Sequence, residues 1–269
     1  MTDHTYKLGF LGAGNMAEAI ARAALENGLL KVGDMIAADP VPQRREVFTQ
    51  LGIAAGEDNV RVIREAAQIM LAVKPQTFAA VGAQLGQVDP AKQVVLSIMA
   101  GIPSGKIVAL SGKPLRVVRI MPNTPVMVGA GMAGVALGQH ARAGDEALTM
   151  RLFGAAGKAV LVSEQAIDAI TAVSGSGPAY VFYLAEAMQK AAAELGLGEH
   201  ADVLVRQTIL GAAKLLSESS DTAAELRRKV TSPGGTTEAA IRHMEGQGLG
   251  AAVVEAIKAA EIRSRELGA

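Results

Sequence analysis

The segment Gly12-Ala13-Gly14-Asn15-Met16-Ala17 constrains the fold of this chain more than any other. It follows the apolar run Leu8–Leu11 and opens the amphipathic stretch Asn15–Glu26, so a buried strand turns directly into a helix. This is the G-x-G-x-x-A spacing, in which the first glycine permits a tight turn, the second lets a pyrophosphate approach the backbone, and the alanine allows close helix–strand packing. The sequence therefore predicts a dinucleotide site at the first strand, with residues 12–16 in contact with the cofactor.

Short apolar runs alternate with amphipathic stretches over residues 1–163. The buried runs are rich in β-branched residues, which favours a mostly parallel sheet covered by helices on both faces. The predicted class is α/β, with a Rossmann-type doubly wound sheet in residues 1–163. Strands are predicted at Leu8–Leu11, Met35–Ala38, Ile69–Val73, Val94–Ile98, Leu115–Ile120, Gly131–Leu137 and Ala159–Val162, and helices at Asn15–Glu26, Val41–Leu51, Phe78–Leu85 and Gly144–Ala155.

The pattern changes after Ser163, and residues 164–269 are predicted to form an all-helical domain. Between Leu204 and Leu216 the apolar residues cover a wider face than a surface helix needs, so this helix is central to its domain or covered by a second subunit. Because this half of the chain is small, we favour an interwoven homodimer. Helices are predicted at Ile167–Val173, Ala179–Leu195, Ala201–Ser217, Ala223–Lys229, Thr237–Glu245 and Gly250–Leu267.

The composition argues against several classes of function. The 26 basic and 26 acidic residues balance without a basic block, which argues against nucleic-acid binding. Cysteine is absent, and the four histidines lack metal-ligand spacing, so we predict no metal site and expect a protein of the reducing cytoplasm. The polar Met1–Lys7 is no signal peptide, and the apolar stretch Tyr180–Leu195 carries three charged residues, so we expect no membrane span.

Asp39 ends the second predicted strand, where an acid holds the adenosine ribose of NAD. Arg44 and Arg45 follow it closely, and either arginine could reach the 2′-phosphate of NADP. The same residues also fit a plain Asp-Pro turn with solvated arginines. This loop leaves the choice between NADH and NADPH open.

Further loops follow the carboxyl ends of the predicted strands, where ligands bind in open α/β sheets. Ala72-Val73-Lys74-Pro75 follows one strand, and a lysine there is more often a phosphate or ribose contact than a general acid. Ala100 and Gly101 follow the next strand as small residues that permit close approach of a ring. Asn123, between two prolines, follows a third strand and is available for hydrogen bonding. We expect all of these residues to line the cofactor.

The segment Val230-Thr231-Ser232-Pro233-Gly234-Gly235-Thr236-Thr237-Glu238 interrupts the helical half. Its two glycines leave the backbone bare just before helical patterning resumes, so several main-chain N–H groups point to one spot at the positive end of a helix dipole. The hydroxyls of Ser232, Thr236 and Thr237 stand beside that spot. The segment predicts a cradle for a small carboxylate.

The segment Ser174-Gly175-Ser176-Gly177-Pro178-Ala179 leads into the longest predicted helix. It is either an N-cap with glycine hinges or also a source of substrate contacts from Ser174 or Ser176. Glu164 allows the same two interpretations, as a helix cap or as a polar wall of the substrate pocket. We take Glu164, Ser174 and Ser176 as candidate substrate-binding residues.

The motifs at residues 12–17, 72–76, 121–125, 174–180 and 231–237 together, in this order, resemble those of pyrroline-5-carboxylate reductases over essentially the whole chain. The resemblance implies reduction of a cyclic imine to L-proline, the last step of proline biosynthesis, by NADPH or NADH, with NADPH favoured by the family. It also implies an interlocked homodimer, in some members a ring of dimers, with each active site between one subunit's cofactor domain and its partner's helices. Asn59 resembles the family's adenosine-side asparagine, and Glu164 a pocket-wall glutamate. Asp39 stands where some NADP-using members carry serine, and Lys229 where some carry asparagine.

The chemistry implied by the resemblance fits the residue types of the diglycine segment. The amides of Gly235 to Thr237, with Ser232, would bind the substrate carboxylate, and Gly234 belongs to the same predicted substrate site. The Thr237 hydroxyl would hydrogen-bond the ring nitrogen and is the predicted catalytic residue.

Three alternatives remain at this point. A 3-hydroxyacid dehydrogenase would need a lysine base in the helical half, and Lys190 and Lys214 lack a partner motif there. A reductase of a different cyclic imine would share every motif above. A nucleotide-sensing or scaffold dimer would bind the cofactor without turnover.

Overall fold

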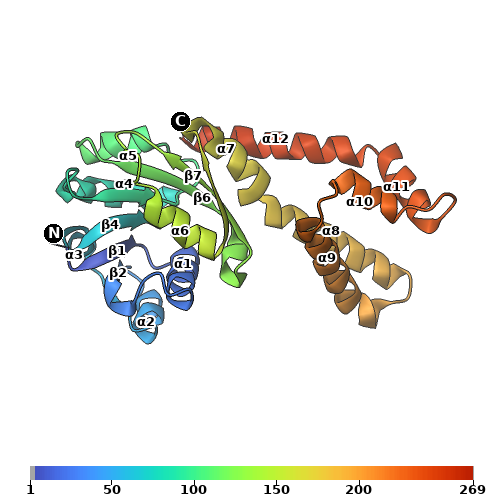
Figure 1. Cartoon of the computed structure of the whole chain (residues 1–269), viewed down its shortest axis with the longest axis horizontal. Coiled ribbons are helices and arrows are strands. Elements are labelled where there is room, and N and C mark those ends of the chain that lie inside the picture. The colour runs from blue at the N-terminus through green and yellow to red at the C-terminus, as the bar shows by residue number, and fades with distance from the viewer. Residues whose placement is uncertain (1–3, 269) are drawn as a thin grey trace. The chain divides into compact units, whose positions relative to one another are not determined.

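The computed structural model describes residues 4–268 (Figure 1). The chain divides into two compact units, Met1–Ser176 with Ala260–Ala269, and Gly177–Ala259. We call them the first and the second unit and describe each by itself.

The first unit contains one sheet in the order β3-β2-β1-β4-β5-β6-β7-β8. The first six strands in this order are parallel to their neighbours, whereas β7 runs antiparallel to β6, and β8 parallel to β7. This is the doubly wound dinucleotide-binding order with two added strands, and the predicted fold class is confirmed. The strands are β1 (Tyr6–Leu11), β2 (Met35–Ala38), β3 (Ala54–Gly56), β4 (Ala66–Leu71), β5 (Val94–Ser97), β6 (Val117–Pro122), β7 (Gly131–Leu137) and β8 (Gly157–Val162).

Helices cover the sheet with two separate apolar cores. Leu8 and Phe10 of β1 point to the core that contains Phe48 of α2, while Leu11 points to the core that contains Ile63 of α3. Successive strand residues face opposite sides, so the almost continuous apolar run of β1 fills both cores. The helices of this sheet are α1 (Asn15–Glu26), α2 (Pro42–Gln50), α3 (Asn59–Glu65), α4 (Phe78–Gly82), α5 (Ser104–Ser111) and α6 (Ala147–Ala155).

Most predicted elements are present, and the differences have local causes. β3 was not predicted, because its three residues are small and show no alternation. α3 and α5 were also missed, since they have only 7 and 8 residues and lack a long amphipathic pattern. The helix predicted over Phe78–Leu85 is α4 followed by a 3₁₀ turn, Ala83–Gln87.

The second unit consists of helices alone. They are α8 (Gly177–Glu194), α9 (Ala201–Glu218), α10 (Ala223–Lys229), α11 (Thr236–Gly246) and the first part of α12 (Leu249–Gly268). Among residues 177–259, all of which the structure describes, only Ala201 and Val205 are buried. No helix of the described chain is long and apolar enough to cross a membrane.

Candidate functional site

The loop between β1 and α1 has the geometry that its two glycines predict. Gly12 adopts φ +97°, and a Cβ there would lie 2.8 Å from the carbonyl oxygen of Ala72 in the neighbouring loop. Gly12 N–H donates to the carbonyl of Ala38, at 2.8 Å. The left-handed backbone and the close approach both require glycine at this position.

Gly14 is the N-cap of α1 and has open space around it, since an added Cβ would meet nothing within 4 Å. The first-turn amides of α1 have no partner within their helix and point out of its positive end. An open cradle that a side chain would fill, at a helix N-terminus, fits a dinucleotide pyrophosphate. The residues therefore suit the cofactor that the motif predicted.

Asp39 lies on the loop that follows β2, and Asn59 begins the helix that follows β3, at the same edge of the sheet. The Asp39 carboxylate accepts hydrogen bonds from the amides of Ala13, at 2.8 Å, and Val41, at 2.9 Å. Asn59 is the first residue of α3, and its Nδ2 donates to Oε1 of Gln84, at 2.9 Å. The structure thus places Asp39 directly beside the glycine loop.

The loops after β4 and β5 complete the middle of this edge. Ala72 N–H donates to the carbonyl of Leu11, which ties the first of these loops to β1, while Lys74 is exposed to solvent. Gly101 adopts φ +72°, and a Cβ there would lie 2.7 Å from Cβ of Leu267 near the end of α12. The end of α12 belongs to the first unit and packs on the Gly101 loop.

Asn123, directly after β6, connects to the segment that contains Ser174. Its Nδ2 donates to the carbonyl of Ser174, at 3.0 Å, and its Oδ1 accepts from Met132 N–H, at 2.8 Å. Gly175 lies so close to β6 that a Cβ would approach Cε of Met121 to 2.4 Å. Ser174 is therefore held at the carboxyl edge of the sheet, together with the cofactor loops.

The glycine-rich segment predicted as a hinge or an N-cap begins in a π-helical turn and ends in the first turn of α8, where Pro178 is the second residue. The π-helical turn spans Thr171–Gly175 and follows α7 (Ile167–Ile170), and Ser176 N–H donates to the carbonyl of Thr171, at 2.8 Å. The Ser174 hydroxyl donates to the carbonyl of Ile170, at 3.1 Å, so it is no helix cap. Turns of this kind are frequent at functional sites, and periodicity in a sequence does not reveal them.

Glu164 has a role that local sequence could not reveal. Its carboxylate accepts from Ser104 N–H, at 2.8 Å, and from Ser104 Oγ, at 2.6 Å, and lies 3.3 Å from Nη1 of the buried Arg119. It therefore caps the N-terminus of α5 from a distance of 60 residues along the chain. Both carboxylate oxygens are engaged within the first unit, and contact of Glu164 with a substrate stays a prediction.

The diglycine turn lies in the second unit and leads into α11. Gly234 adopts φ +70°, Gly235 is the N-cap, and a Cβ on Gly235 would lie 2.4 Å from Oγ of Ser232. Thr236 and Thr237 occupy the first two helical positions, where backbone N–H groups have no acceptor within the helix. Gly234 N–H donates to Glu238, and Gly235 N–H donates to the carbonyl of Ser232, at 3.0 Å, so the two glycine amides that the sequence predicted as anion donors are engaged within the turn. The first-turn amides of Thr236 and Thr237 and the adjacent hydroxyls are what this turn offers to an anion.

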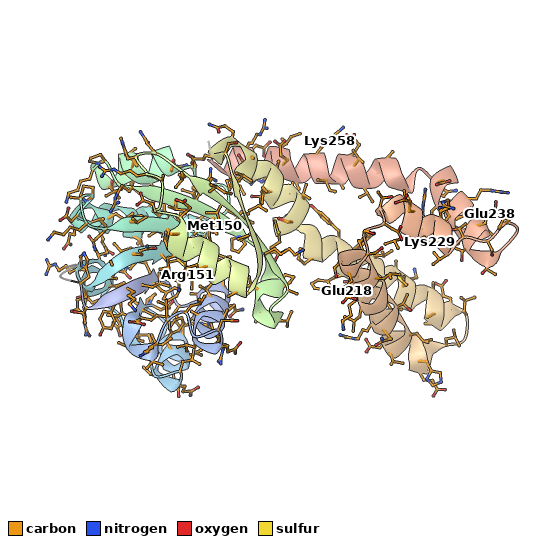
Figure 2. All side chains as sticks on the ribbon, in the orientation of Figure 1. Met150, Arg151, Glu218, Lys229, Glu238 and Lys258 are labelled. Atoms are coloured by element: carbon orange, nitrogen blue, oxygen red, sulfur yellow. The ribbon has the colours of Figure 1, made fainter. Side chains whose placement is uncertain are left out.

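Two charged residues of the second unit, Lys229 and Glu238, lie before and after this turn in the chain (Figure 2). Lys229, at the end of α10, donates to Asp221, and this hydrogen bond holds the pKa of the Asp221 carboxyl below its usual value. Glu238, in the first turn of α11, accepts from Gly234 N–H and from Arg242, the latter at 3.0 Å. Lys229 is therefore paired inside its own unit.

The site as a whole defines a class of protein. A glycine loop that leads β1 into α1, with an acid at the end of β2 in a sheet of this order, belongs to dinucleotide-binding proteins of the Rossmann type. Within residues 4–268, no cluster of His, Asp and Glu could hold a metal ion.

Comparisons with known proteins identify the family. A family model described as pyrroline-5-carboxylate reductase dimerisation matches residues 164–267, and one described as NADP oxidoreductase coenzyme F420-dependent matches residues 7–101. The pyrroline-5-carboxylate reductase of Pseudomonas aeruginosa is 41% identical over 98% of this chain and 97% of its own. The chain belongs to the pyrroline-5-carboxylate reductase family, as the motifs predicted.

Two solved structures agree with this assignment. A pyrroline-5-carboxylate reductase from Coxiella burnetii has a TM-score of 0.90 at 36% identity, and the match covers 99% of this chain and 100% of that one. Plasmodium falciparum pyrroline carboxylate reductase, solved with NADP bound, has a TM-score of 0.86 at 28% identity, with complete coverage of both chains, 100% each.

Proposed function

We propose that this protein reduces 1-pyrroline-5-carboxylate to L-proline with NAD(P)H, the last step of proline biosynthesis. Membership of the family over the full chain supports this function. The observation that supports the reaction most directly is the N-terminus of α11, which follows Gly234 and Gly235 and has first-turn amides without an acceptor in the helix. A dinucleotide fold alone does not account for a second anion site of this kind. Such a cradle suits the carboxylate of a small cyclic imino acid.

The residues of the cradle bind and orient the substrate. The first-turn amides of Thr236 and Thr237 and the Ser232 hydroxyl bind the carboxylate, and Gly234 and Gly235 keep the approach to them free of side chains. The Thr237 hydroxyl accepts a hydrogen bond from the protonated ring nitrogen, which turns the imine carbon toward the cofactor. A hydrogen bond to a charged group contributes about 1.5–3 kcal/mol. When bound, NAD(P)H supplies the hydride, so positioning accounts for much of the rate.

The cofactor residues lie on the loops of the first unit. Gly12–Met16 would hold the pyrophosphate, and Asp39 and Asn59 would hold the adenosine ribose. Ala72–Pro75, Ala100, Gly101 and Asn123 would hold the nicotinamide end. We also propose that Ser174, Ser176 and Glu164 contact the substrate, and the bonds of Glu164 to Ser104 hold its carboxylate in place.

We further propose that the working unit is a homodimer through the helical domain, whose dimers assemble into a ring. The helices of residues 177–259 bury almost nothing within one chain and expose Phe182, Leu204 and Leu216, each about half or more. Apolar faces of this extent mark subunit interfaces. We place the functional boundary between residues 163 and 164 and expect the enzyme in the cytoplasm.

A spectrophotometric assay tests this function. Oxidation of NADH and NADPH is followed with 1-pyrroline-5-carboxylate, and a 3-hydroxyacid with NAD⁺ or NADP⁺ is assayed in parallel. We expect turnover of the imine alone. Turnover of the hydroxyacid alone would replace the proposal with a dehydrogenase, and cofactor binding without turnover of any imine would indicate a sensor.

A further inference from the structure

The carboxylate of Asp39 is fixed in one orientation beside the glycine loop. Its Oδ2 accepts from Ala13 N–H, at 2.8 Å, and its Oδ1 from Val41 N–H, at 2.9 Å. An ionised carboxylate has about four acceptor sites, so these two bonds leave others for the hydroxyls of a ribose. The ionised carboxylate has no hydrogen to donate to the oxygens of a phosphate.

Arg44 is already used within the fold. Its Nε donates to the carbonyl of Ala13, at 2.6 Å, and its Nη2 lies 3.0 Å from Oε2 of Glu18. The other oxygen of Glu18 accepts from Nε of Arg22, at 2.9 Å. The charge of Arg44 is thus matched by a carboxylate from the dinucleotide helix α1 itself.

Arg45 is engaged in the same way on the other side. Its Nη1 donates to the carbonyls of Asp39, at 2.9 Å, and Pro40, at 3.0 Å, and its Nη2 lies 2.8 Å from Oε1 of Glu57. Three arginines and three carboxylates therefore balance around the end of β2: Arg22, Arg44, Arg45, Glu18, Asp39 and Glu57. No excess positive charge is left there for a second phosphate.

We propose that this enzyme uses NADH in preference to NADPH, and that Asp39 sets the preference while Glu18 and Glu57 hold both arginines away from a cofactor phosphate. The proposal rests on the proposed function for its reaction, but it concerns only the adenosine end of the cofactor. The 2′-hydroxyl of NADH donates to the Asp39 carboxylate. The 2′-phosphate of NADPH brings about two negative charges to the same place, beside a carboxylate and in a cluster without net charge.

The test measures cofactor binding directly. The full-length protein is titrated with NADH and with NADPH, without substrate, and the nicotinamide fluorescence gives each Kd. We expect NADH to bind about tenfold tighter than NADPH or more. The ratio of kcat/KM values with 1-pyrroline-5-carboxylate is then measured for the same two cofactors and should follow the ratio of affinities.

Two variants separate the parts of the argument. Asp39→Ser removes the carboxylate, and we expect the preference for NADH to fall about tenfold or more through tighter binding of NADPH. Glu18→Gln frees Arg44, and we expect NADPH to bind about threefold to tenfold tighter. Asp34→Asn is the matched control, because Asp34 precedes β2 at the opposite end of the strand, and its cofactor ratio should equal that of the wild type.

The outcomes distinguish this inference from the reaction. Equal or tighter binding of NADPH by the wild type overturns the inference, whatever the turnover. The same holds if Asp39→Ser, folded by circular dichroism, keeps the wild-type ratio while Glu18→Gln also leaves NADPH binding unchanged. If NADH binds tighter than NADPH but the imine is not turned over, the proposed function is wrong and the inference about the cofactor is supported.

Discussion

The two units of this protein differ in what holds them together. In the first unit both faces of the sheet are packed, and side chains such as Phe10, Phe48 and Leu11 are fully buried. In the second unit five helices bury little more than Ala201 and Val205. Burial of apolar surface is the main favourable term in folding, so the first unit has a core of its own, and the second needs apolar surface from outside. We therefore expect one chain to be sufficient for cofactor binding, whereas the proposed substrate cradle needs a second subunit to cover the helices of the second unit.

The largest effect is expected from a charge on the exposed apolar face of α9. Leu216 is 51% exposed in the single chain, and Leu216→Glu would bury an unpaired carboxylate in the proposed dimer, at a cost of about 3–5 kcal/mol. We expect a monomer by light scattering and a loss of turnover of about a hundredfold or more. NADH binding should remain. The matched control is Leu110→Glu, at a leucine 41% exposed on α5 of the first unit, which should stay dimeric. A dimeric, active Leu216→Glu would break the comparison.

Thr237→Ala tests the substrate cradle of the second unit. The loss of one hydrogen bond to a charged group lowers kcat/KM for the imine by about tenfold to a hundredfold, without a change in the Kd of the cofactor. Steady-state kinetics with the imine measure kcat/KM, and a fluorescence titration measures the Kd of the cofactor. Thr231→Ala serves as the control, because the Thr231 hydroxyl already donates to the carbonyl of Arg227, four residues earlier. The kinetics of this variant should match those of the wild type. Equal kinetics in both variants would remove Thr237 from the mechanism.

Gly12→Ala tests the self-sufficient first unit. The new Cβ would lie 2.8 Å from the Ala72 carbonyl, at a backbone φ of +97°. We expect strain of about 1–3 kcal/mol, a lower Tm and about tenfold weaker cofactor binding. Gly28 also has a positive φ, at +63°, but lies in open space, so Gly28→Ala should lower only the Tm. Calorimetry and fluorescence titration separate the two effects, and unchanged cofactor affinity in Gly12→Ala would contradict the assignment of the loop.

The smallest effect is expected where α12 meets the first unit. Ser264 is buried, and its hydroxyl donates to Oδ1 of Asp168, at 2.7 Å. Ser264→Ala should reduce the free energy of unfolding by about 1–3 kcal/mol, since it removes the hydrogen bond that the buried hydroxyl donates to the partly exposed carboxylate of Asp168. Ser217→Ala removes an exposed hydroxyl and should have no measurable effect on urea denaturation. Equal stability of the two variants would show that the end of α12 adds nothing to the first unit.

The elements that the sequence predicted correctly have strong local patterns. Asn15–Glu26 is α1 to the residue, because the glycine loop ends directly before this segment and six buried positions lie within it. α5 was missed because part of its capping comes from Glu164, which no local window contains. The π-helical turn at Thr171–Gly175 was missed because the spacing of apolar residues in a sequence does not reveal such a turn.

The dinucleotide loop and the diglycine turn follow from the sequence by itself, since each depends on the spacing of residues within a short segment. The α/β class also follows from it, through the alternation of strand and helix patterns along the first 163 residues. The tertiary structure alone decided how Arg44 and Arg45 are used, because their partners Glu18 and Glu57 lie on other elements. It alone revealed that the helices of the second unit lack a core, because burial is a property of how segments pack in space and not of their order in the chain.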